Sequence, residues 1–303
     1  MRAVPIPPWP GEYLDIGDMR LHVRTTPEGP QETAVFVHGL AGSATNWTDL
    51  MAELAGEVRG IAVDLPGSGH SPEPPGGDYS LDAHARAVVR LIERVGGPVH
   101  LFGNSMGGAI SVRVAATRPD LVSSLTLISP ALPDLRPRYG PARVALSALP
   151  VVGDFLIGRL SSIPADLRVR ESMRMCFADP SAVHPDRYRE AVEELRRRDD
   201  LPYADAALLG CARALVKEYF RTGPQNLWRQ AARVTAPTLA IYGLRDRLVH
   251  PDTALRAART FPDIRVVRLP RIGHVAQMEV PRVVAWEARQ HIGRARTPLR
   301  RTA

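Results

Sequence analysis

Apolar positions along this chain follow two patterns that alternate. Short apolar runs stand between longer stretches in which apolar residues recur at helical spacing, as at Leu81, Ala85, Val88, Val89 and Ile92. The first pattern is typical of β-strands and the second of amphipathic helices. The expected strands occupy residues 13–16, 20–25, 33–37, 60–63, 99–102, 122–128, 238–242 and 264–269. Because helices separate most of them, the pattern predicts an α/β fold with a mostly parallel sheet covered by helices on both faces.

The pattern changes between residues 133 and 234, where strand-like runs are absent. Helical segments punctuated by proline are expected there, at 142–149, 165–177, 186–198, 203–220 and 224–232. We interpret 133–234 as a helical cap inserted into a core made of 1–132 and 235–293. The cap is expected over the carboxyl edge of the sheet, where α/β proteins bind ligands. Its apolar stretch 144–160 also suits transient contact with a lipid surface, but Pro150, Gly153 and Asp154 interrupt it and favour an ordinary pair of helices.

Composition and charge narrow the class of protein. The chain has 303 residues, 45% of them hydrophobic, which suits a globular α/β domain with an insertion. No uninterrupted apolar stretch reaches the ~18 residues of a membrane span, and residues 1–11 lack the apolar centre of a secretory signal, so the cytoplasm is the expected location. The net charge is +7, but four arginines lie in 294–303 without any acid. We therefore expect a basic, disordered tail there rather than a nucleic-acid surface.

The segment from Val99 to Ala109 contains the strongest chemical signal. It joins an expected strand to an expected helix through Gly103-Asn104-Ser105-Met106-Gly107, which is the Gly-x-Ser-x-Gly nucleophile elbow in its strand–turn–helix setting. Side chains at Gly103 and Gly107 would collide across so tight a turn. Backbone strain of about 1–3 kcal/mol projects the Ser105 hydroxyl out of the sheet, above a helix N-terminus that favours negative charge. Ser105 is the predicted nucleophile.

A serine hydroxyl needs a base, and the base needs a group that orients it. In this architecture both follow late strands, in the order serine, acid, histidine. Asp246 comes directly after the expected strand 238–242, and His274 follows the strand 264–269. They are the predicted acid and base. Two alternatives remain open at this point, namely His250 as the base and Asp134, after the strand 122–128, as the acid.

Two backbone N–H groups are needed to stabilise an oxyanion. The N–H of Met106 is one donor because it starts the helix after Ser105, and the other is expected in the loop after the third strand. There Gly39 allows a sharp turn, so Leu40 is the predicted second donor. We interpret His38 as a structural residue, and the turn-rich stretch 64–71 as scaffold.

Taken together, these motifs resemble the α/β-hydrolase superfamily. The resemblance rests on His38-Gly39, the stretch 64–71, Gly103-Asn104-Ser105-Met106-Gly107-Gly108, Asp246 and Gly273-His274, and covers residues from about 12 to 292. It implies an eight-stranded sheet, a helical cap and a Ser-His-Asp mechanism. The elbow and Gly-His-Val-Ala-Gln-Met-Glu are similar to those of meta-cleavage-product hydrolases, which cut carbon–carbon bonds. The third-strand loop His-Gly-Leu-Ala-Gly-Ser departs from that group and is more similar to carboxylesterases and lipase-like members.

The sequence therefore predicts a serine hydrolase that cleaves a small to medium apolar carboxylic ester through an acyl-enzyme. It predicts no metal and no organic cofactor. Carbon–carbon bond hydrolysis and a slow or non-catalytic ligand receptor are the alternatives, and acyl transfer is left open. Apolar cap residues expected in the substrate pocket are Leu156, Met173, Phe177 and Phe220. Cys176 and Cys211 lack metal-type spacing and are expected to be buried small hydrophobes, with a disulfide between them left open. Acyl chain length and oligomeric state are not predicted.

Overall fold

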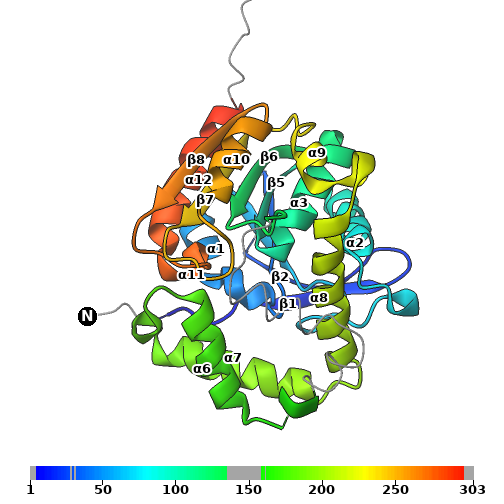
Figure 1. The fold of residues 1–303 in the computed structure, drawn as a ribbon, viewed down its shortest axis with the longest axis vertical. Helices are drawn as coiled ribbons and strands as arrows, with labels where there is room; N and C mark the ends of the chain where they lie inside the picture. The colour runs from blue at the N-terminus through cyan, green and yellow to red at the C-terminus, as the bar shows by residue number, and fades with distance from the viewer. Residues whose placement is uncertain (1–4, 28, 31, 135–157, 161, 297–303) are drawn as a thin grey trace, which may run out of the picture.

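A sheet of eight strands forms the centre of the computed structural model, which describes residues 5–27, 29–30, 32–134, 158–160 and 162–296. The strand order is β1-β2-β4-β3-β5-β6-β7-β8. The strands are β1 Gly11–Asp15, β2 Arg20–Thr25, β3 Thr33–Val37, β4 Arg59–Val63, β5 Val99–Asn104, β6 Val122–Ile128, β7 Thr238–Gly243 and β8 Ile264–Leu269. The predicted fold class is confirmed, and Figure 1 shows the strands at the centre of the molecule.

The direction of the strands determines which loops lie at the same edge of the sheet. β1 and β2 form an antiparallel hairpin, and β2 pairs antiparallel with β4. All neighbouring pairs from β4 across to β8 are parallel. Since the carboxyl ends of parallel strands meet at one edge, the loops after β3, β5, β6, β7 and β8 lie along the same side of the sheet.

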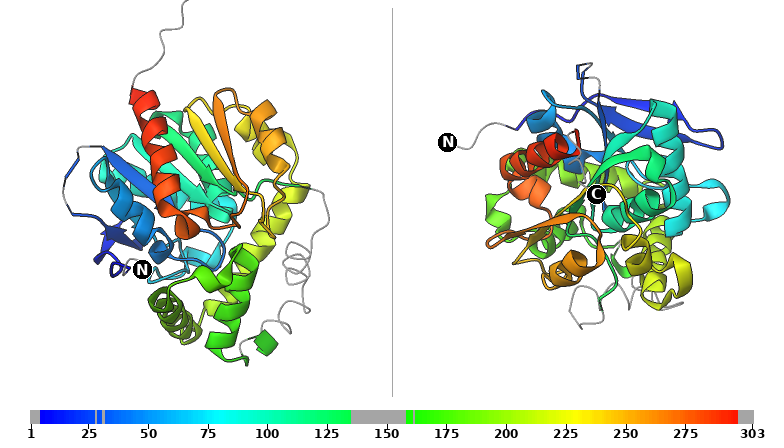
Figure 2. Two further views of the ribbon diagram at one scale, coloured as in Figure 1. Left: turned by 90° about the vertical axis from the view of Figure 1, so that its left-hand side faces the viewer. Right: turned by 90° about the horizontal axis from the view of Figure 1, so that it is seen from above.

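Helices cover both faces of the sheet, as predicted. Helices α2, α3, α9 and α10 pack on one face, and α1, α11 and α12 on the other; Figure 2 shows α12 lying across its face. The helices of the core are α1 Thr48–Leu54, α2 Leu81–Val95, α3 Met106–Thr117, α10 Thr253–Thr260, α11 Ala276–Glu279 and α12 Pro281–Arg296, with 3-10 turns at Ala44–Trp47, Pro75–Gly77 and Pro119–Leu121. No helix in the described part of the chain is long and apolar enough to span a membrane.

The segment between β6 and β7 is helical wherever it is described. It contains α6 Ala165–Cys176, α7 Pro185–Asp199, α8 Ala204–Phe220 and α9 Leu227–Ala231, with 3-10 turns at Pro180–Ala182 and Gly223–Gln225. The expected helix at 142–149 lies outside the described residues. α6 and α7 pack on each other through a small apolar cluster of their own, at the lower end of the molecule in Figure 1. In contrast, Leu227, Trp228 and Ala231 of α9 belong to the main core. The chain thus returns to the core before residue 234, where we expected the insertion to end.

The C-terminal helix is longer than expected. α12 continues to Arg296, so the predicted start of a disordered tail at residue 294 is wrong. Arg294 pairs with Asp263 at 2.5 Å, and the Arg296 Nε donates to Glu32 at 2.6 Å. These acids lie far away in the sequence, so inspection of the terminal segment alone shows only uncompensated positive charge.

A buried ion pair joins the inserted helices to the core. Arg113 of α3 and Glu218 of α8 each have side chains that are 3% exposed, and Arg113 Nη2 lies 2.8 Å from Glu218 Oε2. Arg113 also pairs with Asp82 of α2 at 3.1 Å and donates to Gln230 of α9 at 3.2 Å. Removing either partner of a buried pair leaves an uncompensated charge and typically costs about 3–5 kcal/mol. This network therefore ties α8 to the helix that follows Ser105.

Candidate active site

Ser105 occupies a strained turn between β5 and α3. Its φ of 55° and ψ of −119° lie in a region that residues other than glycine rarely adopt. The turn is held on both sides by backbone hydrogen bonds: Ser105 N–H donates to the Ile128 carbonyl at 3.1 Å, and the Ser105 carbonyl accepts from Ala131 at 2.9 Å. The structure therefore has the predicted elbow geometry, and the neighbouring strand β6 holds it in place.

Glycines around this turn allow the backbones to touch. A Cβ on Gly107 would lie 2.1 Å from the Val37 carbonyl oxygen and 2.5 Å from that of His38. A Cβ on Gly39 would lie 2.9 Å from the Cβ of Ser105. The loop after β3 thus lies directly against the Ser105 turn, at the position predicted for the second oxyanion donor.

His274 and Asp246 form a buried pair on the loops after β8 and β7. His274 Nδ1 lies 2.8 Å from Asp246 Oδ2, with side chains only 4% and 1% exposed. The other carboxylate oxygen accepts from the backbone N–H groups of Leu248 at 2.7 Å and Val249 at 2.9 Å. Burial acts to raise the pKa of Asp246, but the His274 charge and these hydrogen bonds outweigh it and hold the pKa below its usual value. Asp246 is therefore an ionised acceptor that orients the imidazole.

Direct contacts bring the three loops together. The Asn104 amide donates to the His274 carbonyl at 3.1 Å and to the Ile128 carbonyl at 3.0 Å. Asn104 is the residue before Ser105, so it links the nucleophile turn to the histidine loop. A Cβ on Gly243 would lie 2.0 Å from the Gly273 carbonyl oxygen, so the end of β7 also touches that loop. The structure brings Ser105, Asp246 and His274 to one edge of the sheet.

The two alternative residues, His250 for the base and Asp134 for the acid, make other contacts. His250 Nδ1 accepts from the Asp252 N–H at 3.1 Å, just before α10. Asp134 lies beside Tyr219 of α8, where burial raises the tyrosine pKa and the Asp134 charge adds to it.

His38 contacts the backbone through both ring nitrogens: its Nδ1 is 2.7 Å from the Gly39 carbonyl, and its Nε2 accepts from the Leu65 N–H at 3.1 Å. These contacts fit the structural role expected of His38.

Leu40 and Met106 line one small cavity beneath the inserted helices. Its opposite wall includes Arg198 from α7 together with Leu208 and Cys211 from α8. Arg198 and Cys211 were not predicted to lie here, because helical spacing does not show which face of an inserted helix is directed toward the sheet. Asn104 could have been found from its position next to Ser105.

The residues expected in the substrate pocket are mostly placed elsewhere. Phe220 is 78% exposed, because it is the last residue of α8 and its side chain leaves the packed face. Met173 and Phe177 are buried in the α6–α7 cluster together with Val275. Leu156 lies outside the described residues. Phe220 as a pocket residue is wrong, and neither Met173 nor Phe177 lines the cavity beside Leu40 and Met106.

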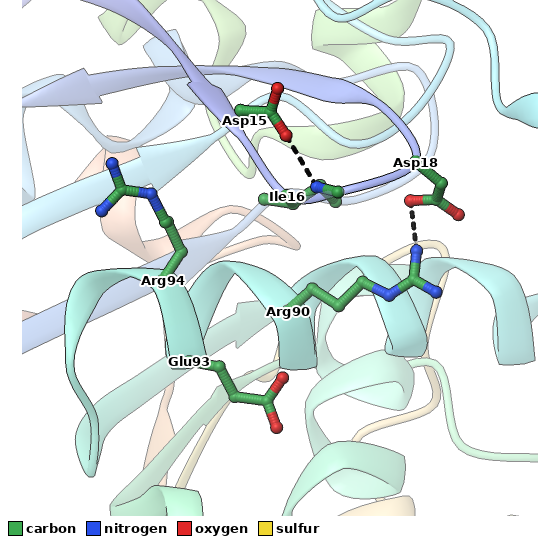
Figure 3. A pocket seen from close by; sticks show the side chains of 7 residues that line it. Asp15, Ile16, Asp18, Arg90, Glu93 and Arg94 are labelled. Atoms are coloured by element: carbon green, nitrogen blue, oxygen red, sulfur yellow. Dashed lines mark hydrogen bonds and ion pairs between the residues drawn. The ribbon is translucent and has the colours of Figure 1, made fainter.

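A second hollow lies between the β1–β2 turn and the end of α2. Figure 3 shows acidic and basic side chains around it, with Arg90 paired to Asp18. The Asp15 carboxylate accepts from the Gly17 N–H at 2.8 Å. α2 ends just before β5 begins, so this hollow lies toward the amino ends of the parallel strands. None of the predicted site residues lines it.

Neither a metal cluster nor a disulfide is found among the described residues. In those ranges no group of three or more His, Cys, Asp or Glu side chains could hold a metal ion. Both cysteines are free thiols. Cys211 is buried, with its Sγ 3.4 Å from His84 Nε2, while Cys176 at the end of α6 is half-buried. Burial raises the pKa of each thiol to about 12, so both are protonated and unreactive at neutral pH.

Comparisons with known proteins show the family and the fold. A family model described as alpha/beta hydrolase fold matches residues 34–281. The dihydrolipoyllysine-residue acetyltransferase component of the acetoin cleaving system of Pseudomonas putida is 32% identical over 248 residues, covering 81% of this chain but only 59% of that protein. A 2-hydroxy-6-oxononadienedioate/2-hydroxy-6-oxononatrienedioate hydrolase of Cupriavidus pinatubonensis is 28% identical over 268 residues, 86% of each chain.

Solved structures show the same fold. The crystal structure of 2-hydroxy-6-oxo-6-phenylhexa-2,4-dienoate hydrolase from Rhodococcus sp. strain RHA1 matches with a TM-score of 0.76 and 21% identity, covering 93% of this chain and 98% of that one. At this identity the match concerns the arrangement of the backbone.

Replacing Gly107 by alanine tests the close contact at the elbow. Helix propensity alone would favour alanine by up to about 1 kcal/mol, but the new Cβ meets the Val37 carbonyl at 2.1 Å. We therefore expect Gly107→Ala to lower the free energy of unfolding by about 1–3 kcal/mol, as overpacking does. Urea unfolding measures it. Gly293→Ala in α12, where a Cβ meets nothing within 4 Å, is the control and should be neutral or stabilising. If both variants were stabilised equally, the predicted steric contact at Gly107 would be wrong.

Proposed function

The chain belongs to the α/β-hydrolase family, and on that premise we propose that it hydrolyses carboxylic esters of small to medium, apolar substrates through an acyl-enzyme on Ser105. The observation that carries the proposal is the buried 2.8 Å contact between His274 Nδ1 and Asp246 Oδ2 at the sheet edge that holds the Ser105 turn. A serine on a strained turn together with an oriented imidazole is the arrangement needed for acyl transfer.

In the proposed first step the Ser105 hydroxyl attacks the ester carbonyl. His274 accepts the hydroxyl proton at Nε2, while its Nδ1–H remains hydrogen-bonded to Asp246. The ionised Asp246 keeps the imidazole in the tautomer that can accept a proton and then stabilises the imidazolium. The Leu40 and Met106 N–H groups stabilise the developing oxyanion, where loss of one donor typically costs ~10²–10³ in rate.

In the second half the proton on His274 passes to the leaving alcohol. Water then attacks the acyl-enzyme, with His274 as base, and releases the acid and the free Ser105 hydroxyl. The N-terminus of α3 lies beneath the reacting atoms and favours the negative charge of both tetrahedral intermediates.

Replacing Ser105 by alanine tests the nucleophile. We expect Ser105→Ala to abolish turnover of short p-nitrophenyl esters, with at least about a 10³-fold loss in kcat, because no other hydroxyl takes its place. The circular dichroism spectrum should remain that of the wild type. Ser68→Ala, in the lining of the small cavity beside Leu40 and Met106, is the matched control and should retain turnover. Wild-type rates in Ser105→Ala would remove Ser105 from this role.

The pH dependence tests the base. Protonated His274 cannot accept the serine proton, so kcat/KM should fall on acidification below about pH 7, approaching tenfold per pH unit. Acid unfolding would act in the same direction, because burial lowers the pKa of His84 and His291 to about 4 and the folded state therefore loses stability as the pH falls below about 6.5. Only the fall in rate seen while the protein stays folded reports on His274. Ester hydrolysis from pH 5 to 8, with folding monitored by circular dichroism, provides the measurement. A flat profile would exclude a titrating base.

Carbon–carbon hydrolysis is the second candidate, favoured by Arg198. Its guanidinium lines the cavity beside Leu40 and Met106, and its hydrogen bond to the Ala41 carbonyl is long, at 3.4 Å. No ion pair to Arg198 occurs within the described ranges. An unpaired guanidinium there suits a substrate carboxylate, and the Cupriavidus relative is named for hydrolysis of a dioate.

A ring-fission dienol carboxylate distinguishes the two candidates. If the second is correct, the wild type should consume the coloured dienol faster than any p-nitrophenyl ester. Arg198→Gln should then raise the KM for the dienol by roughly tenfold or more, the value of one charge-assisted hydrogen bond, and leave the KM for neutral esters unchanged. Arg196→Gln, on the exposed side of α7, is the control. Faster turnover of neutral esters, unaffected by Arg198→Gln, would support ester hydrolysis instead.

A further inference from the structure

Glu279 connects two segments that are distant in sequence. It is the last residue of α11, five positions after His274. Its Oε1 accepts from the Gly273 N–H at 2.8 Å, in the histidine loop. Its Oε2 accepts from the Ala178 N–H at 2.9 Å, in the segment that follows α6. A single carboxylate therefore bridges the histidine loop and the inserted helices.

Other contacts join the same two segments. The His274 N–H donates to the Cys176 carbonyl at 2.7 Å. Arg247, next to Asp246, donates to the Phe177 carbonyl at 3.3 Å and also to the Arg174 carbonyl. A Cβ on Gly273 would lie 2.5 Å from the Cys176 carbonyl oxygen, so the two backbones are in direct contact. The end of α6 is thus held by the loops that carry both the acid and the base.

An ionised carboxylate satisfies this geometry fully. Two N–H donors face the two oxygens of Glu279, and a carboxylate accepts at both, whereas the amide of glutamine would direct one of its own hydrogens at a donor. Burial raises the pKa of Glu279 above its usual value and the nearby Asp246 charge adds to the rise, while the hydrogen bonds from Ala178 and Gly273 and the charge of His274 oppose it. The negative charge is therefore close enough to His274 to stabilise its protonated form.

We propose that Glu279 is a positioning residue, whose carboxylate ties the segment after α6 to the histidine loop and thereby fixes the His274 imidazole for proton transfer. The backbone of His274 is then fixed at both ends, by Cys176 at its N–H and by Asn104 at its carbonyl. The inserted helices take part in holding the base, in addition to covering the site. The inference rests on the proposed function only in assigning His274 as the base.

The substitution Glu279→Gln tests the proposal because it keeps the size and removes the charge and one acceptor. We expect kcat for a short p-nitrophenyl ester to fall by roughly 10- to 100-fold, as small misplacements of catalytic groups do, with little change in KM. The acid limb of kcat/KM should move to lower pH, because a negative charge near the imidazolium is lost. Amide hydrogen exchange should increase in residues 174–180 and 271–276.

Two further variants separate positioning from general structural support. Glu279→Asp keeps the charge but is shorter, so it should lower kcat while leaving the acid limb in place. Glu193→Gln, the same change on the exposed side of α7, should alter none of the readouts. If Glu279→Gln does not fold, as judged by circular dichroism, the proposal is tested on Glu279→Asp. A lower kcat and faster hydrogen exchange in the two segments would support it, and wild-type values of both would overturn it. A structural role alone would lower stability without moving the acid limb.

Each outcome supports or overturns the inference. Unchanged kcat and an unmoved acid limb in Glu279→Gln would overturn it, as would unchanged exchange in both segments. If the wild type hydrolyses no ester, the proposed function fails, and hydrogen exchange still decides whether Glu279 couples the two segments. Faster exchange in both segments would then support the coupling, and exchange equal to wild type would overturn it.

Discussion

Direct backbone contact between loops at the carboxyl edge of the sheet is the constraint on which the rest of the structure depends. At Gly107, Gly39 and Gly243, a Cβ would lie within 3 Å of a neighbouring loop. Those contacts bring the ends of β3, β5, β7 and β8 so close that a hydroxyl, an imidazole and a carboxylate share one edge. The strained φ of Ser105 persists because β6 and the loop after it hold the turn by hydrogen bonds.

Two buried histidine–aspartate pairs occur in the part of the chain that the structure describes, and they lie at different places in the fold. His22 and Asp64 are 2.7 Å apart, and Asp64 also accepts from the N–H groups of Ala44 and His70. That pair organises the turn-rich stretch 64–71, and a Cβ on Gly11 would lie 2.2 Å from His22 Nε2, so backbone covers the second ring nitrogen. Asp246 and His274 have the same chemistry, but they lie beside the nucleophile turn.

Polar contacts act together with apolar packing to hold the inserted helices in place. The Arg187–Asp49 ion pair at 2.5 Å joins α7 to helix α1, and the Arg197 bond to the Gly69 carbonyl at 2.6 Å joins it to the stretch 64–71. The buried Arg113–Glu218 pair joins α8 to α3. Ion pairs and charge-assisted bonds need defined partners, so they set the orientation of these helices more sharply than apolar packing would. Glu279 follows the same rule at the histidine loop.

The sequence by itself determined the features that depend on neighbouring residues. Hydrophobic spacing identified the strands and helices, and the glycines around Ser105 identified the elbow, because strand–turn–helix geometry is local. Asp246 and His274 followed from their positions after late strands. Only the tertiary structure decided which faces of the inserted helices meet the core, so Phe220 was placed wrongly, while Arg198 and the bridging role of Glu279 were missed. The same holds for Arg294 and Arg296, because their acidic partners are brought to them only by folding.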